Sequence, residues 1–292
     1  AGDVRIAVKV GGGQGRTPRI ADAIKRDLDW RELLNYSEAV LRVYNRLGRR
    51  DQIFKARVKM QVETLGAEAF AALVEEEWAH LRGGPNTIND EEFARVSSYF
   101  VDPPTDELLQ STAIVISPQF RAWTGRNVAP HRNGAYAIVT ISLKREGVAP
   151  GDATADEMDA IASIADRYSS SELRVAHTQN LVLPHVPRVK LVALWEELES
   201  LKLARGNIGL ASDIICCPGG DFCSLANAKS IPLSAEIAER LAPIEDDLGP
   251  IAIKVSGCIN ACGHHHVGHI GVLGVEKAGE DWYQILLGGR AD

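Results

Sequence analysis

Residues 136–201 decide the fold of this chain, because strand-like and helix-like segments follow one another there in a compact cycle. The segments are YAIVTISL at 136–143, TADEMDAIASIADRY at 154–168, LRVAH at 173–177, LVL at 181–183 and PRVKLVALWEELESL at 187–201. Thr154 and Glu157 have the spacing of a capping box, which predicts the start of the first helix. Strand, helix, strand, strand, helix is the core of the ferredoxin-like arrangement, in which helices cover one face of an antiparallel sheet. We therefore predict an α+β fold with a ferredoxin-like half-domain at residues 119–203.

The chain before this half-domain, residues 1–118, opens on a strand-like stretch. Val4–Val10 alternates apolar and polar side chains and runs into Gly11–Gly13, a loop in which the backbone can approach another group closely. Thr17 and Pro18 then predict the cap and first turn of a helix.

Helical spacing of apolar residues continues from there to about Leu81, and Gly48 and Gly66 stand where helix C-terminal caps belong. We expect a cluster of helices beside a sheet. Glycine and proline then interrupt the periodicity, at Gly83–Asn89, Pro103, Pro104 and Pro118. This change in composition predicts a domain boundary near Gln119.

The last segment, residues 204–292, contains all five cysteines and half of the eight histidines. It ends in two strand-like runs, Gly268–Val275 and Trp282–Leu287, around a turn at Lys277–Glu280. A concentration of metal-ligating side chains in one segment predicts that this part of the chain holds a cofactor.

Composition excludes several classes of protein. With 292 residues, 45% hydrophobic, the chain can bury a substantial core, and no run approaches the roughly 20 apolar residues that cross a bilayer. The N-terminus lacks the order of a signal peptide, so we expect a cytoplasmic location and no membrane contact. A net charge of −7 argues against a nucleic-acid partner, which needs a basic face. Five cysteines are too few, and odd in number, for a disulfide scaffold.

Four of the cysteines form two close pairs. Cys217 and Cys223 are separated by five residues, Cys258 and Cys262 by three, and 34 residues lie between the pairs. Such a set suits a metal or iron-sulfur centre. Zinc sites usually have spacings of two to four residues, so the first pair favours an iron-sulfur cluster, with zinc as the alternative. We interpret Cys216, next to Cys217, as a buried small hydrophobic residue.

The sequences Cys217-Pro-Gly-Gly-Asp-Phe-Cys223 and Gly257-Cys-Ile-Asn-Ala-Cys-Gly263 resemble the C-terminal signature of nitrite and sulfite reductase haemoproteins. The resemblance extends through Arg49–Gly66, Val139–Lys144 and Arg174–Asn180, and so covers essentially the whole chain. It implies a 4Fe-4S cluster held by Cys217, Cys223, Cys258 and Cys262 and a sirohaem. It also implies that Cys262 is the catalytic bridging ligand, shared by the cluster and the sirohaem iron.

The resemblance suggests further residues that contact the cofactor. Arg57 and Lys59 lie where the family has cofactor-facing basic residues, and the alternative for both is a solvated helix face. Asn260 is expected to hydrogen-bond the macrocycle or orient a sulfur, and its alternative role is to form a turn. The motif at Arg174–Asn180 departs from the family, since Ala176 stands where threonine is usual. That motif is then predicted to be a polar bend joining two strands.

A group of histidines follows the last cysteine: His264, His265, His266 and His269. His265 and His269 have the spacing that would place both on one face of a helix, as a second metal site would need. The neighbouring glycines look strand-like instead, which disfavours such a site. Hydrogen bonds to sulfur, or protons for the reduction, are alternative roles that sequence does not separate.

The resemblance implies the six-electron reduction of sulfite to sulfide, with nitrite reduction as the first alternative. It also implies a small anionic substrate and an electron donor, either ferredoxin or a flavoprotein. Members of the family have two similar halves, and their anion-binding residues come mostly from the first. We therefore expect this chain to be a fragment that lacks the N-terminal half and is inactive by itself. A non-catalytic iron-sulfur or zinc protein, or an interaction module, is the alternative from a different class.

Overall fold

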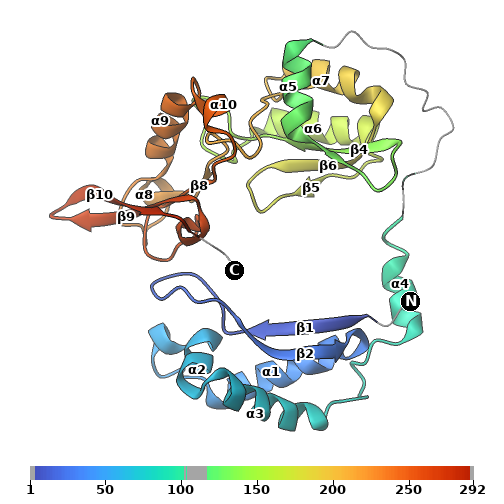
Figure 1. Cartoon of the computed structure of the whole chain (residues 1–292), viewed down its shortest axis with the longest axis vertical. Coiled ribbons are helices and arrows are strands. Elements are labelled where there is room, and N and C mark those ends of the chain that lie inside the picture. The colour runs from blue at the N-terminus through green and yellow to red at the C-terminus, as the bar shows by residue number, and fades with distance from the viewer. Residues whose placement is uncertain (1–3, 102, 104–116, 290–292) are drawn as a thin grey trace. The chain divides into compact units, whose positions relative to one another are not determined.

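The computed structural model describes residues 4–101, 103 and 117–289, and these divide into two compact units (Figure 1). Unit 1 comprises residues 4–101, and unit 2 comprises residue 103 and residues 117–289. The predicted linker residue Pro104 lies outside the described residues. The boundaries predicted near residues 118 and 203 stay predictions.

Unit 1 consists of a two-stranded antiparallel sheet and helices on one side of it (Figure 1). Its elements are β1 (Arg5–Val10), β2 (Asp22–Asp29), η1 (Trp30–Glu32), α1 (Leu33–Leu47), η2 (Ile53–Lys55), α2 (Val58–Leu65), α3 (Ala67–Ala79) and α4 (Asp90–Ser97). Leu28 of the sheet packs with Tyr36 of α1 and Phe70 of α3 in one buried cluster. Helices α1 and α2 end at Gly48 and Gly66, as predicted.

The helix predicted to start at Thr17 and Pro18 is wrong. The chain turns back there, through a bridge between Gly13 and Arg19, and continues as strand β2. Ile24 and Leu28 of β2 are buried against the helices. A spacing of four residues places side chains on one face of a helix and also on one face of a strand, so periodicity alone does not separate the two.

The first part of unit 2 has the predicted ferredoxin-like cycle. Its elements are α5 (Pro118–Asn127), β3 (Val128–Pro130), β4 (Tyr136–Ile141), α6 (Ala155–Tyr168), β5 (Arg174–Val175), β6 (Leu181–Pro187), η3 (Arg188–Lys190) and α7 (Leu191–Ser200). The sheet has the order β3-β4-β6-β5, with every pair antiparallel. The capping box of Thr154 and Glu157 starts α6, as predicted.

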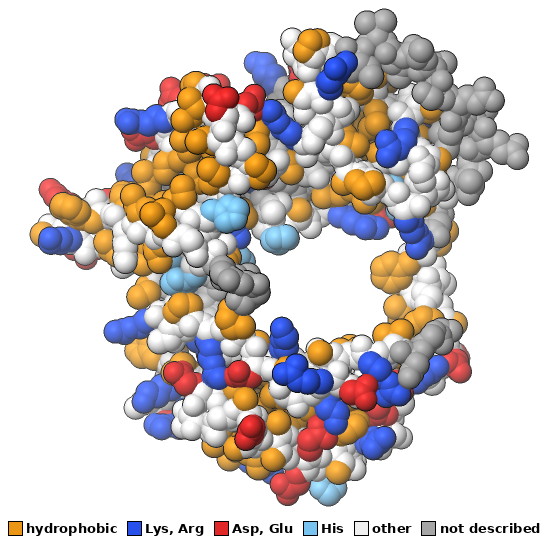
Figure 2. Space-filling view, in the orientation of Figure 1, with side chains coloured by type: hydrophobic (Ala, Val, Ile, Leu, Met, Phe, Trp, Pro, Cys, Tyr) orange, Lys and Arg blue, Asp and Glu red, His pale blue; other side chains and the backbone are white. Residues whose placement is uncertain are grey.

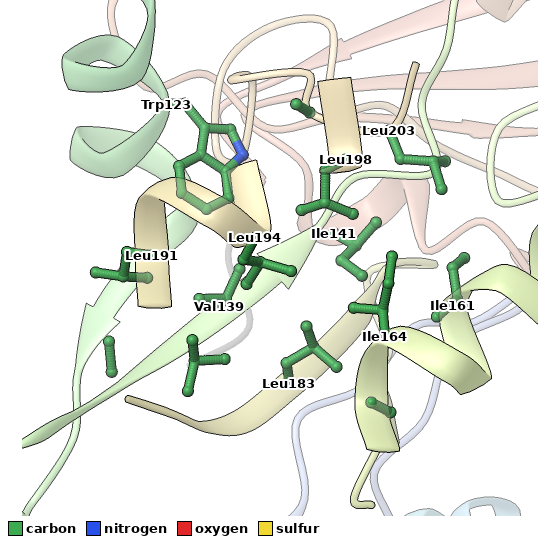
Figure 3. Close-up of a cluster of buried hydrophobic side chains, with 14 of the residues drawn as sticks. Trp123, Val139, Ile141, Ile161, Ile164, Leu183, Leu191, Leu194, Leu198 and Leu203 are labelled. Atoms are coloured by element: carbon green, nitrogen blue, oxygen red, sulfur yellow. The ribbon is translucent and has the colours of Figure 1, made fainter. Parts of the chain in front are cut away.

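The core of this half-domain lies between the sheet and its helices (Figure 3). Val139 and Leu183 face Ile164 of α6 and Leu194 of α7, and all four are fully buried. Trp123 of α5 closes one end of the cluster. No residue of the central strands β4 and β6 is fully exposed.

The second part of unit 2, residues 204–289, is called the C-terminal lobe below. Its elements are β7 (Ile215–Cys216), α8 (Gly219–Phe222), α9 (Ile231–Leu241), α10 (Glu245–Leu248), β8 (Ile253–Ser256), η4 (His265–Val267), β9 (Ile270–Lys277) and β10 (Glu280–Leu287). The sheet order is β10-β9-β8-β7, with β7, β8 and β9 parallel and β9-β10 an antiparallel hairpin. The hairpin confirms the two strands predicted at the end of the chain.

Charges on the surface of unit 1 are mixed, and Figure 2 shows basic side chains beside acidic ones. Lys25 pairs with Glu75, and Arg42 pairs with Glu38 and Glu77. Among the residues that the structure describes, no helix combines the length and the apolar character needed to cross a membrane.

Candidate metal and cofactor site

The four paired cysteines lie at one edge of the sheet of the C-terminal lobe. Cys217 directly follows β7, and Cys223 caps the short helix α8 that comes next. Cys258 and Cys262 lie in the loop after β8. Because β7 and β8 are parallel neighbours, their carboxyl ends reach the same edge of the sheet. The backbone N–H of Cys217 donates to the carbonyl of Val255 over 3.1 Å, which joins the two strands at that edge.

Backbone hydrogen bonds hold the two cysteine loops against each other. The N–H groups of Asn227 and Ala228 donate to the carbonyl of Gly257, over 2.9 and 3.1 Å. The N–H of Gly257 in turn donates to Sγ of Cys217 over 3.1 Å. A backbone donor aimed at sulfur is a typical support for a thiolate ligand, since it stabilises the negative charge.

Glycine is required where the loops cross. A Cβ atom at Gly257 would lie 2.7 Å from Cα of Gly219 and 2.7 Å from the carbonyl oxygen of Ala228. At Gly263, a Cβ atom would lie only 1.9 Å from the carbonyl oxygen of Val255. These contacts are with backbone, which has no side-chain rotamer to change. The glycines around the cysteines therefore allow close backbone packing, as the sequence indicated.

The four thiols interact electrostatically. Burial raises the pKa of Cys262 above its usual value, and the charges of Cys217, Cys258 and Cys223 raise it further. Within the described ranges, no three His, Cys, Asp or Glu side chains converge closely enough to hold a single metal ion. Four thiols that influence one another electrostatically fit the Cys₄ ligand set of an iron-sulfur cluster.

Cys216 is separate from this set. Its side chain is buried in the core of the C-terminal lobe with Ile214 and Val255, as predicted for a small hydrophobic residue. Burial raises the pKa of Cys216 to about 11. Without a metal this thiol is therefore neutral at neutral pH, in keeping with its place in an apolar core.

Gln179 is a positioning residue that the sequence did not reveal. Its Nε2 donates to the carbonyl of Cys216 over 2.7 Å, and its Oε1 accepts the N–H of Cys216 over 3.0 Å. The side chain thus pairs with β7 as a strand backbone would, directly beside Cys217. The available signal was the Gln179-Asn180 pair at the predicted polar bend.

Asn180 and Lys144 tie the ferredoxin-like sheet to the C-terminal lobe. Asn180 accepts the N–H of Leu143 and donates to Oδ1 of Asp213, over 3.1 and 3.0 Å. Nζ of Lys144 donates to the carbonyl of Thr178 over 2.6 Å and lies 3.4 Å from Oδ1 of Asp213. Burial lowers the pKa of Lys144, and the charge of Asp213 opposes that shift. The polar bend is therefore structural, as expected, and anchors β7 from the side.

Arg57 and Lys59 lie in unit 1 and bind its own glycine loop. Arg57 donates to the carbonyl of Gln14 over 2.8 Å, and Lys59 donates to the carbonyls of Gln14 and Thr17 over 2.9 and 2.7 Å. Lys59 is 5% exposed, so the solvated-face alternative is wrong for it, whereas Arg57 is exposed. Burial lowers the pKa of Lys59, and the charge of Arg57 adds to that effect. Their predicted contact with the sirohaem stays a prediction.

Asn260 is exposed in the loop between Cys258 and Cys262. The left-handed residue of this loop is Ala261, with φ of 60°, and not Asn260. Asn260 is a central residue of the turn that the N–H of Ala261 closes onto the carbonyl of Cys258 over 3.2 Å, so its turn-forming role stays open beside the predicted contact with the cofactor.

The histidines after Cys262 have separate surroundings. His264 is exposed, whereas His265 is fully buried in η4 and lies against His266, with ring centroids 4.0 Å apart and an interplanar angle of 46°. Burial, followed by the charge of His266, lowers the pKa of His265 to about 4. Nδ1 of His269 accepts the N–H of Ala252 over 3.1 Å.

Two protein-family models match this chain. Residues 2–81 match the nitrite and sulphite reductase 4Fe-4S domain, and residues 130–201 match the nitrite/sulfite reductase ferredoxin-like half domain. The chain belongs to the nitrite and sulfite reductase family. The cofactors of this family are a 4Fe-4S cluster and sirohaem. All five cysteines lie outside the two matched segments, so the family models do not test the ligand set.

Individual relatives in the family include enzymes for both anions. The chain is 27% identical over 269 residues to a chloroplastic ferredoxin–nitrite reductase of Arabidopsis thaliana, covering 89% of this chain and 40% of that protein. It is 26% identical over 292 residues to sulfite reductase [ferredoxin] 1 of Mycolicibacterium paratuberculosis, covering 96% and 46%. The solved structure of the Mycobacterium tuberculosis NirA protein matches with a TM-score of 0.71 and 24% identity, over 98% of this chain and 48% of that one. The fold of the family is thus present, and the chain spans less than half the length of these relatives.

Proposed function

We propose that this chain supplies the cluster-holding portion of a ferredoxin-dependent reductase that converts sulfite to sulfide with six electrons. The observation that carries the proposal is that Cys217, Cys223, Cys258 and Cys262 lie in the segments that follow the neighbouring parallel strands β7 and β8, at the same edge of the sheet. In this proposal the four thiolates hold the 4Fe-4S cluster, and Cys262 is shared with the sirohaem iron. When bound, these groups store electrons and bind the anion at the point where the electrons are delivered.

The residues of the chain have distinct roles in this proposal. The N–H of Gly257 stabilises the thiolate of Cys217, and Gln179 keeps the adjoining strand in place. Cys262 is exposed, in contrast to Cys258, as a ligand that must also reach a second cofactor would be. Asn260, exposed beside Cys262, and the pair Arg57 and Lys59 are the proposed contacts to the carboxylates and edge of the sirohaem.

Two features of the relatives bear on donor and substrate. The reductases of Arabidopsis thaliana and Mycolicibacterium paratuberculosis named above both carry ferredoxin in their names, which supports ferredoxin over a flavoprotein as electron donor. Ferredoxin–nitrite reductases of several plants and of Synechococcus elongatus are also similar to this chain, so nitrite reduction to ammonia is the second candidate. The chain spans less than half the length of these relatives, and on the family resemblance the anion-binding residues belong mainly to the other half. We therefore propose that residues 1–292 alone have no turnover. The cytoplasmic location expected from the sequence stays a prediction.

Anaerobic reconstitution with iron, sulfide and sirohaem tests the ligand set. We expect about four iron and four sulfide per chain for the cluster, besides the iron of any sirohaem that binds. Cys258→Ser should lose most of that content, and the matched control Cys216→Ala should retain it. One zinc ion per chain, bound without sulfide, would support the structural-zinc alternative instead. Unchanged metal content and stability in Cys262→Ser would favour the interaction module.

Substrate and completeness are tested separately. A full-length protein that contains this segment should be assayed with sulfite and with nitrite, using reduced ferredoxin, and the ratio of the two kcat/KM values identifies the substrate. Sulfite turnover by residues 1–292 alone, with full sirohaem absorbance, would disprove the proposed inactivity of the segment.

A further inference from the structure

Two histidines face each other on the ferredoxin-like half-domain, outside the cysteine site. His131 follows β3, and His185 lies on β6, 54 residues further along the chain. Nε2 of His131 lies 3.2 Å from Nδ1 of His185, and the ring centroids are 5.3 Å apart with an interplanar angle of 77°. Both side chains are at least partly buried, and that of His185 is 12% exposed.

The far nitrogen of each ring has its own partner. Nε2 of His185 lies 3.1 Å from Oε2 of Glu172, and the other carboxylate oxygen of Glu172 pairs with Arg174 over 2.5 Å. Nδ1 of His131 lies 3.2 Å from the carbonyl oxygen of Asn133, and it also accepts the N–H of Asn133 over 2.9 Å.

These partners permit two proton arrangements. In the first, Nε2–H of His131 donates to Nδ1 of His185, and Nε2–H of His185 donates to Glu172. In the second, the proton of His131 moves to Nδ1 and donates to the carbonyl of Asn133, and the bond from the N–H of Asn133 to Nδ1 is given up. Nε2 of His131 and Nδ1 of His185 then each have a lone pair, while the far nitrogens donate to Asn133 and to Glu172.

The second arrangement has the features of a metal site. Histidine ligands almost always donate the other ring N–H to a carboxylate or a backbone carbonyl, which fixes the tautomer. Two imidazole nitrogens on one tetrahedral ion stand about 3.3 Å apart, because each Zn–N bond is about 2.05 Å. The observed separation of 3.2 Å already matches that spacing. Neutral imidazole suits zinc, copper and nickel.

We propose that His131 and His185 bind one divalent ion of the zinc and copper class, with water in the remaining positions. Glu172 acts as a positioning residue that holds His185 in the metal-binding tautomer, and Arg174 holds Glu172. Binding releases one proton only if His131 or His185 is protonated beforehand; otherwise the proton of His131 moves within the ring. The site is independent of the cysteine set and of the proposed reductase activity.

A titration of the full chain with zinc chloride, followed by nitrogen-15 NMR of labelled histidine rings, tests this site. Each histidine is read separately, so zinc bound by the cysteines does not obscure the result. We expect Nε2 of His131 and Nδ1 of His185 to shift together and to saturate at one ion. His185→Gln should remove the response of His131, and the control His80→Gln, at an exposed position, should leave it unchanged.

The positioning role has its own test. Glu172→Gln should weaken zinc binding about 10-fold or more, because the neutral amide supports the histidine poorly. If His185→Gln fails to fold, His131→Gln in the loop provides the same comparison through the signal of His185. Unshifted rings of His131 and His185 at saturating zinc, or a shift of His131 that persists in His185→Gln, would overturn the proposal.

Discussion

Replacing Gln179 by methionine should destabilise the strand that carries Cys217. Methionine keeps the length and approximate shape of glutamine but removes both hydrogen bonds to the backbone of Cys216. Cys216 is only 3% exposed, so its N–H and C=O would lose their partners in a largely buried strand. An unsatisfied buried polar group costs about 1–3 kcal/mol. The loss of two such bonds would cost about 2–6 kcal/mol in total. Because Gln179 is itself partly exposed, water can replace part of what is lost, and we expect a decrease of about 2–4 kcal/mol in the free energy of unfolding.

Two measurements check this value. Urea unfolding followed by circular dichroism gives the free energy of unfolding, and hydrogen exchange of a peptide covering residues 213–217 reports on the Cys216 amide itself. Gln119→Met, on the exposed side of α5, is the matched control and should change stability by less than about 0.5 kcal/mol. A change of that small size in Gln179→Met, with unaltered protection of the Cys216 amide, would refute the reasoning.

Three further predictions concern the same unit. Gly263→Ala brings a Cβ atom within 1.9 Å of a backbone oxygen and should lower the free energy of unfolding in urea by about 3 kcal/mol or more. The control Gly279→Ala, in open space at φ of 80°, should lower it by about 1 kcal/mol. Lys144→Met leaves the buried carboxylate of Asp213 without its cation and should cost about 3–5 kcal/mol, and adding Asp213→Asn should restore part of that loss. The pKa of His265 is about 4 in the folded protein, against the ordinary value of 6.5 that applies to the unfolded chain. Below pH 6.5, unfolding is therefore accompanied by the uptake of a proton. The free energy of unfolding should therefore decrease from pH 6.5 to pH 4 by up to about 3 kcal/mol, and His265→Gln should flatten that slope.

Local patterns predicted much of the fold because the forces that form those elements act within a few residues. The capping box of Thr154 and Glu157, and the C-terminal caps at Gly48 and Gly66, are each contained in one turn of chain. Strand β2 was missed because the spacing of Ile24 and Leu28 suits both helix and strand, and pairing with β1 decided between them. Strand β8 and helix α9 were also not predicted, although Ile253 and Val255 alternate with less buried neighbours.

The sequence by itself determined which residue types are available at the candidate site: two close cysteine pairs among glycines, with Cys216 beside them as a buried small residue. Only the tertiary structure decided that the pairs meet, because this depends on the parallel pairing of β7 with β8 across about 40 residues of chain. The same holds for the contact of Gln179 with Cys216 and for that of His131 with His185. In each pair the partners are far apart along the chain, so the local sequence around one residue does not indicate the other. Spacing along a chain reports which side chains share a turn or a strand, whereas contacts between distant segments are selected by the burial and hydrogen bonding of the whole unit.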